Sequence, residues 1–329
     1  MILACALTAA THAHAQGLTE NLRAQLDVGI RGIDNDLTDK TSSMQFVGLD
    51  LQKVFTGGNG DWGVLNLQPY MQRFSGNANP RQNTTKLIYR IFNFNYTGLS
   101  RGGLNVRVGH FIIPFGLEST MNVMGNNGGS LRDEFMPQRF AIKADWGVSL
   151  NGILPLFEYE VALMRGSGNS FKSGDDPYIV SGRVSTPQNR NLVLGLSFFD
   201  GNSYSGGQRA RKTERRRYGV DLQYYFRRFG FLADLSIGDN EDLSNWDAVT
   251  EINWQTDYDS WLLFVQYRRY EQELANSTWA GEDTFRAGLR FEPNNVLQLE
   301  LLVSEQSSRV PDGRDVGVLA AQFRVRFGN

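Results

Sequence analysis

The sequence predicts an all-β fold, a transmembrane antiparallel β-barrel of about sixteen strands, and three observations lead to it. Apolar and polar residues alternate from Leu22 onward in runs of about eight to twelve, as in strands with one oily and one wet face. The connections between these runs alternate between short and long. After the N-terminus, no apolar stretch is long enough for a spanning helix, which needs roughly eighteen residues.

Composition agrees with this fold class. Aromatic residues make up 12% of the chain, and the 35 glycines contrast with only 9 prolines. Hydrophobic residues reach only 41% and the mean hydropathy is −0.36, too polar for a bundle of membrane helices. In a barrel, half of each strand faces water, which keeps the mean hydropathy low. The net charge of −2 provides no basic footprint for nucleic acid.

The N-terminus resembles an export signal. We expect residues 1–15 to form a signal peptide, because they are small and apolar and end in Ala13-His14-Ala15. Residues 16–329 are then the barrel domain. The mature chain would lack cysteine and keep His110 as its single histidine, so we expect no metal site, no cofactor and no thiol nucleophile.

The alternating runs place the strands in chain order. One of the clearest is 192–198, where Leu192, Leu194, Leu196 and Phe198 alternate with Val193, Gly195 and Ser197. The predicted strands centre near Val28, Leu49, Leu67, Phe92, Val106, Val148, Val161, Val180, Leu194, Val220, Leu235, Ile252, Val265, Ala287, Leu299 and Phe323.

The connections suggest an orientation. Short turns are rich in Gly, Asn and Asp, as in 56–60 and 292–295. Aromatic residues such as Phe55, Trp62 and Trp254 flank these turns, which is typical of the girdles of a membrane barrel. We expect the short turns on the periplasmic side and long extracellular loops at 34–42, 75–86, 114–144, 166–176, 200–214, 239–245, 271–282 and 305–315.

The connection 114–144 is far longer than a usual loop, which favours a functional role. We expect it to fold inward and narrow the lumen; a lid at the cell surface is the alternative. Alternation places many arginines on the inner face, where guanidinium groups attract anions. They could instead pair with inward carboxylates and brace the wall. The candidate pore-lining, anion-binding residues are Arg107, Arg132, Arg139, Lys143, Arg183, Arg217, Arg286, Arg290, Arg324 and Arg326.

Two further features allow other interpretations. The basic run 211–217 could gather anions at the pore mouth, bind phosphates of surface lipid, or form a solvated face. Glu158 and Glu160 share one strand face, as in a hydrolase dyad, but wall residues of a pore have the same pattern. Because no nucleophile, base and orienting group occur together, we predict that the protein is not an enzyme.

The segment from Val108 to Glu118 reads VGHFIIPFGLE and resembles the phosphate-selective porin O/P family, in which Pro-Phe-Gly-Leu-Glu precedes the third loop. The strand spacing extends this resemblance over most of the chain. It implies a sixteen-stranded, anion-selective, usually trimeric porin with lysines at the constriction. Here the loop offers Arg132, Arg139 and Lys143 beside acidic Asp133 and Glu134, so the lysine cluster is not evident.

These observations favour a passive outer-membrane porin for small hydrophilic solutes, with preference for anions, including phosphate. The expected partners are outer-membrane lipid, lipopolysaccharide and two further copies in a homotrimer. A barrel that sheaths an electron-transfer partner and an outer-membrane enzyme are the alternatives.

Overall fold

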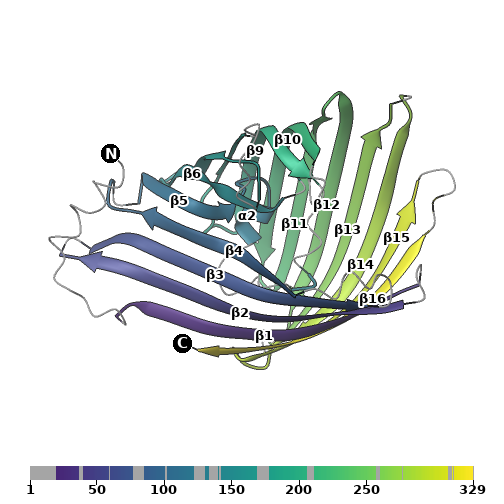
Figure 1. Cartoon of the computed structure of the whole chain (residues 1–329), viewed down its shortest axis with the longest axis horizontal. Coiled ribbons are helices and arrows are strands. Elements are labelled where there is room, and N and C mark those ends of the chain that lie inside the picture. Colours follow the sequence, from purple (N-terminus) through teal and green to yellow (C-terminus); the bar gives the residue numbers. More distant parts are fainter. Residues whose placement is uncertain are drawn as a thin grey trace.

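The computed structural model describes residues 20–36, 40–58, 60–76, 85–100, 102–121, 130–132, 140, 142–168, 178–205, 211–256, 260–275, 277–309, 313 and 315–328. The predicted signal peptide lies outside these residues. The described chain forms sixteen strands in a closed antiparallel barrel in which neighbours in sequence are neighbours in space (Figure 1). The predicted fold class is therefore confirmed.

The first eight strands are β1 (Leu22–Asn35), β2 (Lys40–Gly57), β3 (Gly60–Gly76), β4 (Thr85–Tyr96), β5 (Asn105–Ile112), β6 (Ala144–Ile153), β7 (Glu158–Met164) and β8 (Ile179–Ser185). The second eight are β9 (Leu192–Ser205), β10 (Arg211–Phe226), β11 (Phe229–Asn240), β12 (Leu243–Gln255), β13 (Trp261–Glu273), β14 (Trp279–Phe291), β15 (Leu297–Ser308) and β16 (Val316–Gly328). Every predicted strand centre falls within its strand.

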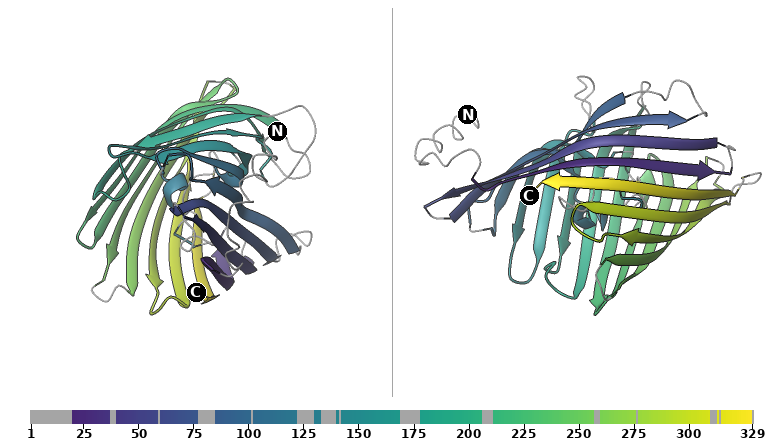
Figure 2. Two further views of the ribbon diagram at one scale, coloured as in Figure 1. Left: turned by 90° about the vertical axis from the view of Figure 1, so that its left-hand side faces the viewer. Right: turned by 90° about the horizontal axis from the view of Figure 1, so that it is seen from below.

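The barrel closes where β1 pairs with β16, with Val28 opposite Val325 and Gln25 opposite Gly328 (Figure 2). The seam is long, so the first and last strands share a regular ladder. The start of β1 and the end of β16 both lie at the end of the barrel that carries the short turns, here called the short-turn end. The opposite end is the long-loop end.

Several predicted long loops are wrong in length. The segment 239–245 is largely strand, since β11 and β12 are joined by residues 241–242 alone, with Glu241 in the left-handed region at φ 55°. Residues 211–214, at the end of the predicted loop 200–214, likewise lie inside β10, so the whole basic run 211–217 is strand. Here polar residues occupy both strand faces, as at the exposed Lys212, Glu214 and Arg216. These residues have no apolar face although their backbone hydrogen bonds to the neighbouring strands continue. Their sequence therefore resembles that of a loop.

The outer face of the barrel is an apolar band. Outward residues such as Ile30, Leu196 and Val303 are exposed, at 47%, 59% and 61%. Aromatic rings border the short turns as predicted, with centroids 5.2 Å apart for Phe55 and Trp62 and 4.2 Å for Trp261 and Phe291. An apolar band with aromatic borders on a closed barrel is typical of a membrane-spanning β-barrel.

The inner face is polar but not open everywhere. On β2 and β3, the rings of Phe46 and Tyr70 lie against Gly29 and Gly48, where an added Cβ would come within 2.2 and 2.1 Å of a ring carbon. Both rings are buried, at 2% and 1% exposure. The glycines therefore leave the space that these two aromatic rings occupy against the inner wall.

Candidate functional site

The candidate site is the segment after β5 together with the inner wall. Its start contains a single helical turn, α2 (Glu118–Met121), which alternation did not predict. Figures 1 and 2 show α2 within the ring of strands. Among the described residues, no helix is long and apolar enough to cross a membrane.

The base of this segment is bonded to inward side chains of β8, β9 and β11. Ser181 Oγ donates to the carbonyl of Pro114 at 3.1 Å, and Gly116 N donates to Ser197 Oγ at 2.9 Å. Leu117 N donates to Asp234 Oδ2 at 2.8 Å. Because these acceptors and donors face the lumen, the base of the segment runs along the inner wall rather than outward over the rim.

The middle of the segment is held by two buried carboxylates on the inner wall. Glu300 of β15 accepts from Ser130 Oγ at 2.8 Å and from Leu131 N at 2.6 Å. Glu251 of β12 forms an ion pair with Arg132, with Nε 3.0 Å from both carboxylate oxygens. Each carboxylate is 1% exposed. The described part of 114–144 therefore lies inside the barrel, in agreement with the predicted inward fold.

Apolar packing adds to these polar contacts. Phe140 stacks on Phe199 of β9 with centroids 3.9 Å apart and planes at 9°, and meets Phe115 edge-on at 5.1 Å. Leu117 packs against Leu232 and Val249 in a separate inner-wall cluster. Such inward apolar residues interrupt the alternation, as in Phe198–Phe199, and those interruptions are the signal in the sequence that could have located the docking surface of the loop.

Most of the candidate cations belong to ion pairs. Arg107 Nη1 is 2.9 Å from Glu160 Oε1, and Arg183 Nη2 is 2.6 Å from Asp221 Oδ1. Lys143 Nζ lies 3.4 Å from Glu118 Oε1 across the base of the loop. The further pairs are Arg132 with Glu251, Arg290 with Glu300, and Arg324 with Asp27.

The remaining candidates have other surroundings. Arg217 donates to the carbonyl of Asp239 and to Asn240 Oδ1, both at 2.6 Å. Arg326 donates to Gln298 Oε1 at 3.0 Å. Arg286 is a half-buried inward residue of β14, and Arg139 lies outside the described residues. The structure thus brings the arginines to one surface, but as members of bonded networks rather than as one cluster.

The pairs are asymmetric in their access to solvent. In Arg132–Glu251 the side chains are 15% and 1% exposed, and in Lys143–Glu118 they are 36% and 10% exposed. The cation is also the more exposed member in Arg107–Glu160, Arg183–Asp221 and Arg290–Glu300. Arg268–Glu282 has the opposite order, at 21% and 30%. The difference is clear in Arg132–Glu251 and Lys143–Glu118, whereas Arg183 and Arg290 are nearly as buried as their carboxylates.

A second part of the inner wall is uncharged. Gln52 donates to Asn66 Oδ1 at 3.2 Å, and Asn66 donates to Asn93 Oδ1 at 3.3 Å. Asn105 donates to Asn151, which donates to Asn95, at 3.1 and 3.2 Å. These side chains form a ladder of amides across β2–β6 near the short-turn end, which offers hydrogen bonds without net charge.

The residues considered for catalysis are engaged in structure. Glu160 accepts from Arg107 and from Ser149 Oγ, the latter at 2.6 Å, and Glu158 accepts from Gln188 N at 2.9 Å. His110 faces outward, with its ring centroid 5.4 Å from that of Trp146, and is 1% exposed. Within the part of the chain that the structure describes, no group of three or more His, Cys, Asp or Glu residues could hold a metal ion.

The fold is that of sixteen-stranded outer-membrane porins. The anion-selective porin from Comamonas acidovorans superposes with a TM-score of 0.62 at 13% identity, over 93% of this chain and 98% of that one. OmpT of Vibrio cholerae gives 0.66 at 8% identity, over 93% and 97%. Pseudomonas putida OprB gives 0.61 at 12% identity, over 93% and 94%.

No protein-family model and no curated protein matches the chain. The resemblance of residues 108–118 to the phosphate-selective porin O/P family therefore stays a prediction. At these identities the structural likeness defines the fold alone.

Proposed function

We propose that the protein is an outer-membrane porin through which small hydrophilic solutes diffuse passively, with a modest preference for anions. The described part of segment 114–144 carries the pore proposal, because it is bonded to the inner wall at several strands of a barrel whose inner face is polar. In this reading the short-turn end faces the periplasm and the long-loop end faces the medium.

The asymmetric ion pairs support the anion preference. A guanidinium that stays accessible beside a buried carboxylate contributes more to the potential in the lumen than its partner does. Since nearly every such cation is partly neutralised, we expect weak selectivity rather than strict exclusion of cations. Anion selectivity is also the property named for the Comamonas acidovorans porin of similar fold. Phosphate is one candidate solute, and a homotrimer the expected assembly.

Single-channel recording in planar bilayers under a KCl gradient tests this proposal. We expect discrete conductance steps and a reversal potential displaced toward the chloride equilibrium potential. A protein that inserts without conducting would contradict the pore, and a reversal potential on the potassium side would contradict the anion preference. A band of about three times the monomer mass before boiling, on a heat-modifiability gel, would support the trimer.

A further inference from the structure

Arg73 is an arginine on the outer wall of the barrel. It lies on β3 between Met71 and Ser75, on the same strand face, and its side chain is exposed. The strand register places it in a row with Ile30, Gln45 and Thr85 across β1–β4. The next row toward the short-turn end consists of Val28, Val47, Met71 and Leu87, which are all apolar. Arg73 therefore marks the edge of the apolar band that faces the long-loop end.

Arg73 differs from other outward arginines near the long-loop end. Arg216 lies 3.8 Å from Asp200, Arg269 pairs with Glu271, and Arg309 pairs with Asp283. Arg73 forms no hydrogen bond or ion pair with the part of the chain that the structure describes. Its guanidinium is therefore presented outward with its donors available to a ligand.

A groove in the outer wall lies beside this arginine. It has a cavity volume of about 610 Å³, and Arg73, Gln45 and Thr85 line its edge toward the long-loop end. Its apolar walls come from strands β16, β1, β2 and β3 at Val28, Ile30, Val47, Met71, Phe323 and Val325. Ile30, Val47 and Met71 are about half exposed, so the groove opens to the surroundings of the barrel.

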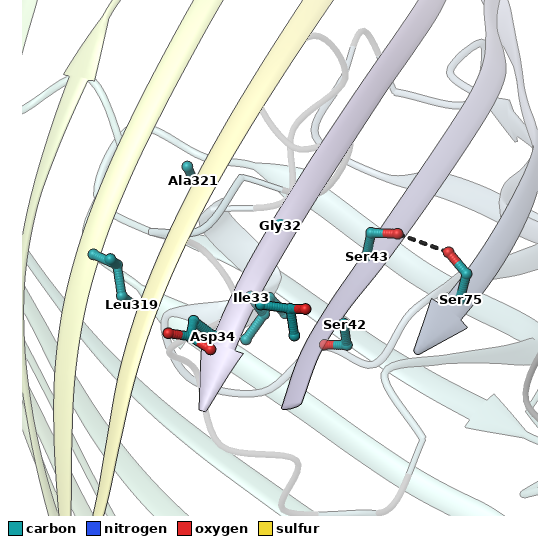
Figure 3. Close-up of a pocket in the computed structure, with 9 residues that line it drawn as sticks. Gly32, Ile33, Asp34, Ser42, Ser43, Ser75, Leu319 and Ala321 are labelled. Carbon is teal, nitrogen blue, oxygen red and sulfur yellow. Dashed lines mark hydrogen bonds between the residues drawn. The ribbon is translucent and has the colours of Figure 1, made fainter. Parts of the chain in front are cut away.

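A second depression, of about 550 Å³, continues toward the long-loop end and has small and hydroxyl side chains (Figure 3). Ser43 and Ser75 point toward each other there, with their Oγ atoms 2.7 Å apart. Gly32 and Ala321 leave room beside them. Asp34 is at the far edge, four residues beyond Ile30 on β1 and so about 13 Å further along the strand.

We propose that this surface binds a phosphorylated glycolipid of the outer leaflet, with an acyl chain in the apolar groove and its phosphate on Arg73. The site rests on the proposed function, which places this end of the band in the outer leaflet. Guanidinium binds phosphate in a bidentate manner, and an arginine at the border of the band lies at headgroup level. The hydroxyls of Ser43 and Ser75 would then face the sugar.

Native mass spectrometry of the purified protein in detergent, titrated with diphosphorylated lipid A, tests this site. We expect Arg73→Gln to weaken binding by about tenfold, because one charge-assisted pair is lost. Arg73→Lys should retain part of the affinity, since a lysine keeps the charge but not the fork. Lipid A with its phosphates removed should bind wild type and Arg73→Gln equally weakly.

Arg216→Gln is the matched control, because Arg216 is also exposed and outward but is paired with Asp200. It should bind diphosphorylated lipid A as wild type does. Loss of binding in Arg216→Gln but not in Arg73→Gln would overturn the site in favour of the basic run. Unchanged lipid binding in Arg73→Gln, with a shift in oligomer mass instead, would assign the arginine to contacts between copies and also overturn it.

Channel recording separates this proposal from the function on which it rests. Arg73 is outside the lumen, so Arg73→Gln should conduct as wild type does while its lipid affinity falls. If wild type does not conduct, the porin proposal fails, whereas the difference in lipid binding between wild type and Arg73→Gln can still be measured.

Discussion

At the scale of single residues, the buried carboxylates of the inner wall determine how the segment after β5 is held. Glu300 is the clearest case, since it meets Arg290 while accepting from Ser130 Oγ and Leu131 N. A buried carboxylate needs this many partners because desolvation of an unpaired charge is costly. The same group therefore stabilises the wall and anchors the loop.

Glu300→Gln should release the middle of the loop. An amide cannot pair with Arg290 or accept as strongly, and breaking a buried pair costs about 3–5 kcal/mol. We expect a larger and noisier single-channel conductance and a reversal potential closer to that of chloride, because Arg290 loses its counter-charge. Glu305→Gln, on the outer face of the same strand, is the control and should conduct as wild type does. A wild-type conductance in Glu300→Gln would contradict the anchoring role.

The pair Arg107–Glu160 allows a test of how the sign of a lumenal charge affects ion selectivity. Both side chains reach the lumen, at 26% and 20% exposure. Arg107→Gln leaves a carboxylate and should move the reversal potential toward cations, whereas Glu160→Gln leaves a guanidinium and should move it toward anions. Arg190→Gln, on an exposed short turn, should leave it in place. Shifts of the same sign in both lumenal variants would show that the pair does not act through its charge.

At the scale of elements, the loop after β5 is stable inside the barrel because apolar and polar contacts act together. Its aromatic residues pack on inward apolar residues of neighbouring strands, a cluster that includes Phe111, Ile179 and Phe199. Its backbone N–H groups donate hydrogen bonds to acceptors on the inner wall, such as Asp234.

Phe140→Ala should weaken this attachment. Removal of a buried phenylalanine costs about 3–5 kcal/mol, and here it also removes the stack on Phe199. We expect the barrel to fold and the mean conductance to rise, with more frequent transitions between levels in single-channel records. Phe226→Ala, beside a short turn and 55% exposed, should leave the conductance unchanged. A Phe140→Ala channel with wild-type conductance would show that the stack does not position the loop.

At the scale of the whole molecule, an ion pair joins the first and last strands of the barrel. Arg324 of β16 pairs with Asp27 of β1, with Nε 2.6 Å from Oδ1, and both side chains are fully buried. Tyr70 OH donates to Asp27 Oδ2 at 2.7 Å and to Asp50 Oδ1 at 3.0 Å. The network spans β16 to β3 and so fastens the seam.

Asp27→Asn should lower the thermal stability of the folded barrel, because it leaves Arg324 buried without its partner, at a cost of about 3–5 kcal/mol. The measurement is the temperature at which heat-modifiable gel migration changes from the folded to the unfolded position. The double variant Asp27→Asn with Arg324→Gln removes both charges and should recover part of the loss. A single variant as heat-stable as wild type would exclude the pair as a seam contact.

Much of the fold could be predicted from the sequence, because the strands obey one local rule. A membrane on one side of a strand and water on the other impose alternation of apolar and polar residues. A run such as 192–198 therefore indicates both a strand and which of its side chains face outward. The rule fails where both faces meet water. It therefore missed the strand extensions at 211–214 and 239–245, which the ladder hydrogen bonds define instead.

The sequence by itself determined the barrel, the inward position of arginines such as Arg107 and Arg183, and the exceptional length of segment 114–144. Only the tertiary structure decided which acid each arginine meets, since Arg132 and Glu251 are 119 residues apart and Asp27 and Arg324 are 297 apart. Whether a side chain faces inward or outward depends on local alternation. Which side chain it meets depends on barrel closure and strand register. Those contacts turned the predicted arginine surface into a set of ion pairs and hydrogen-bonded networks.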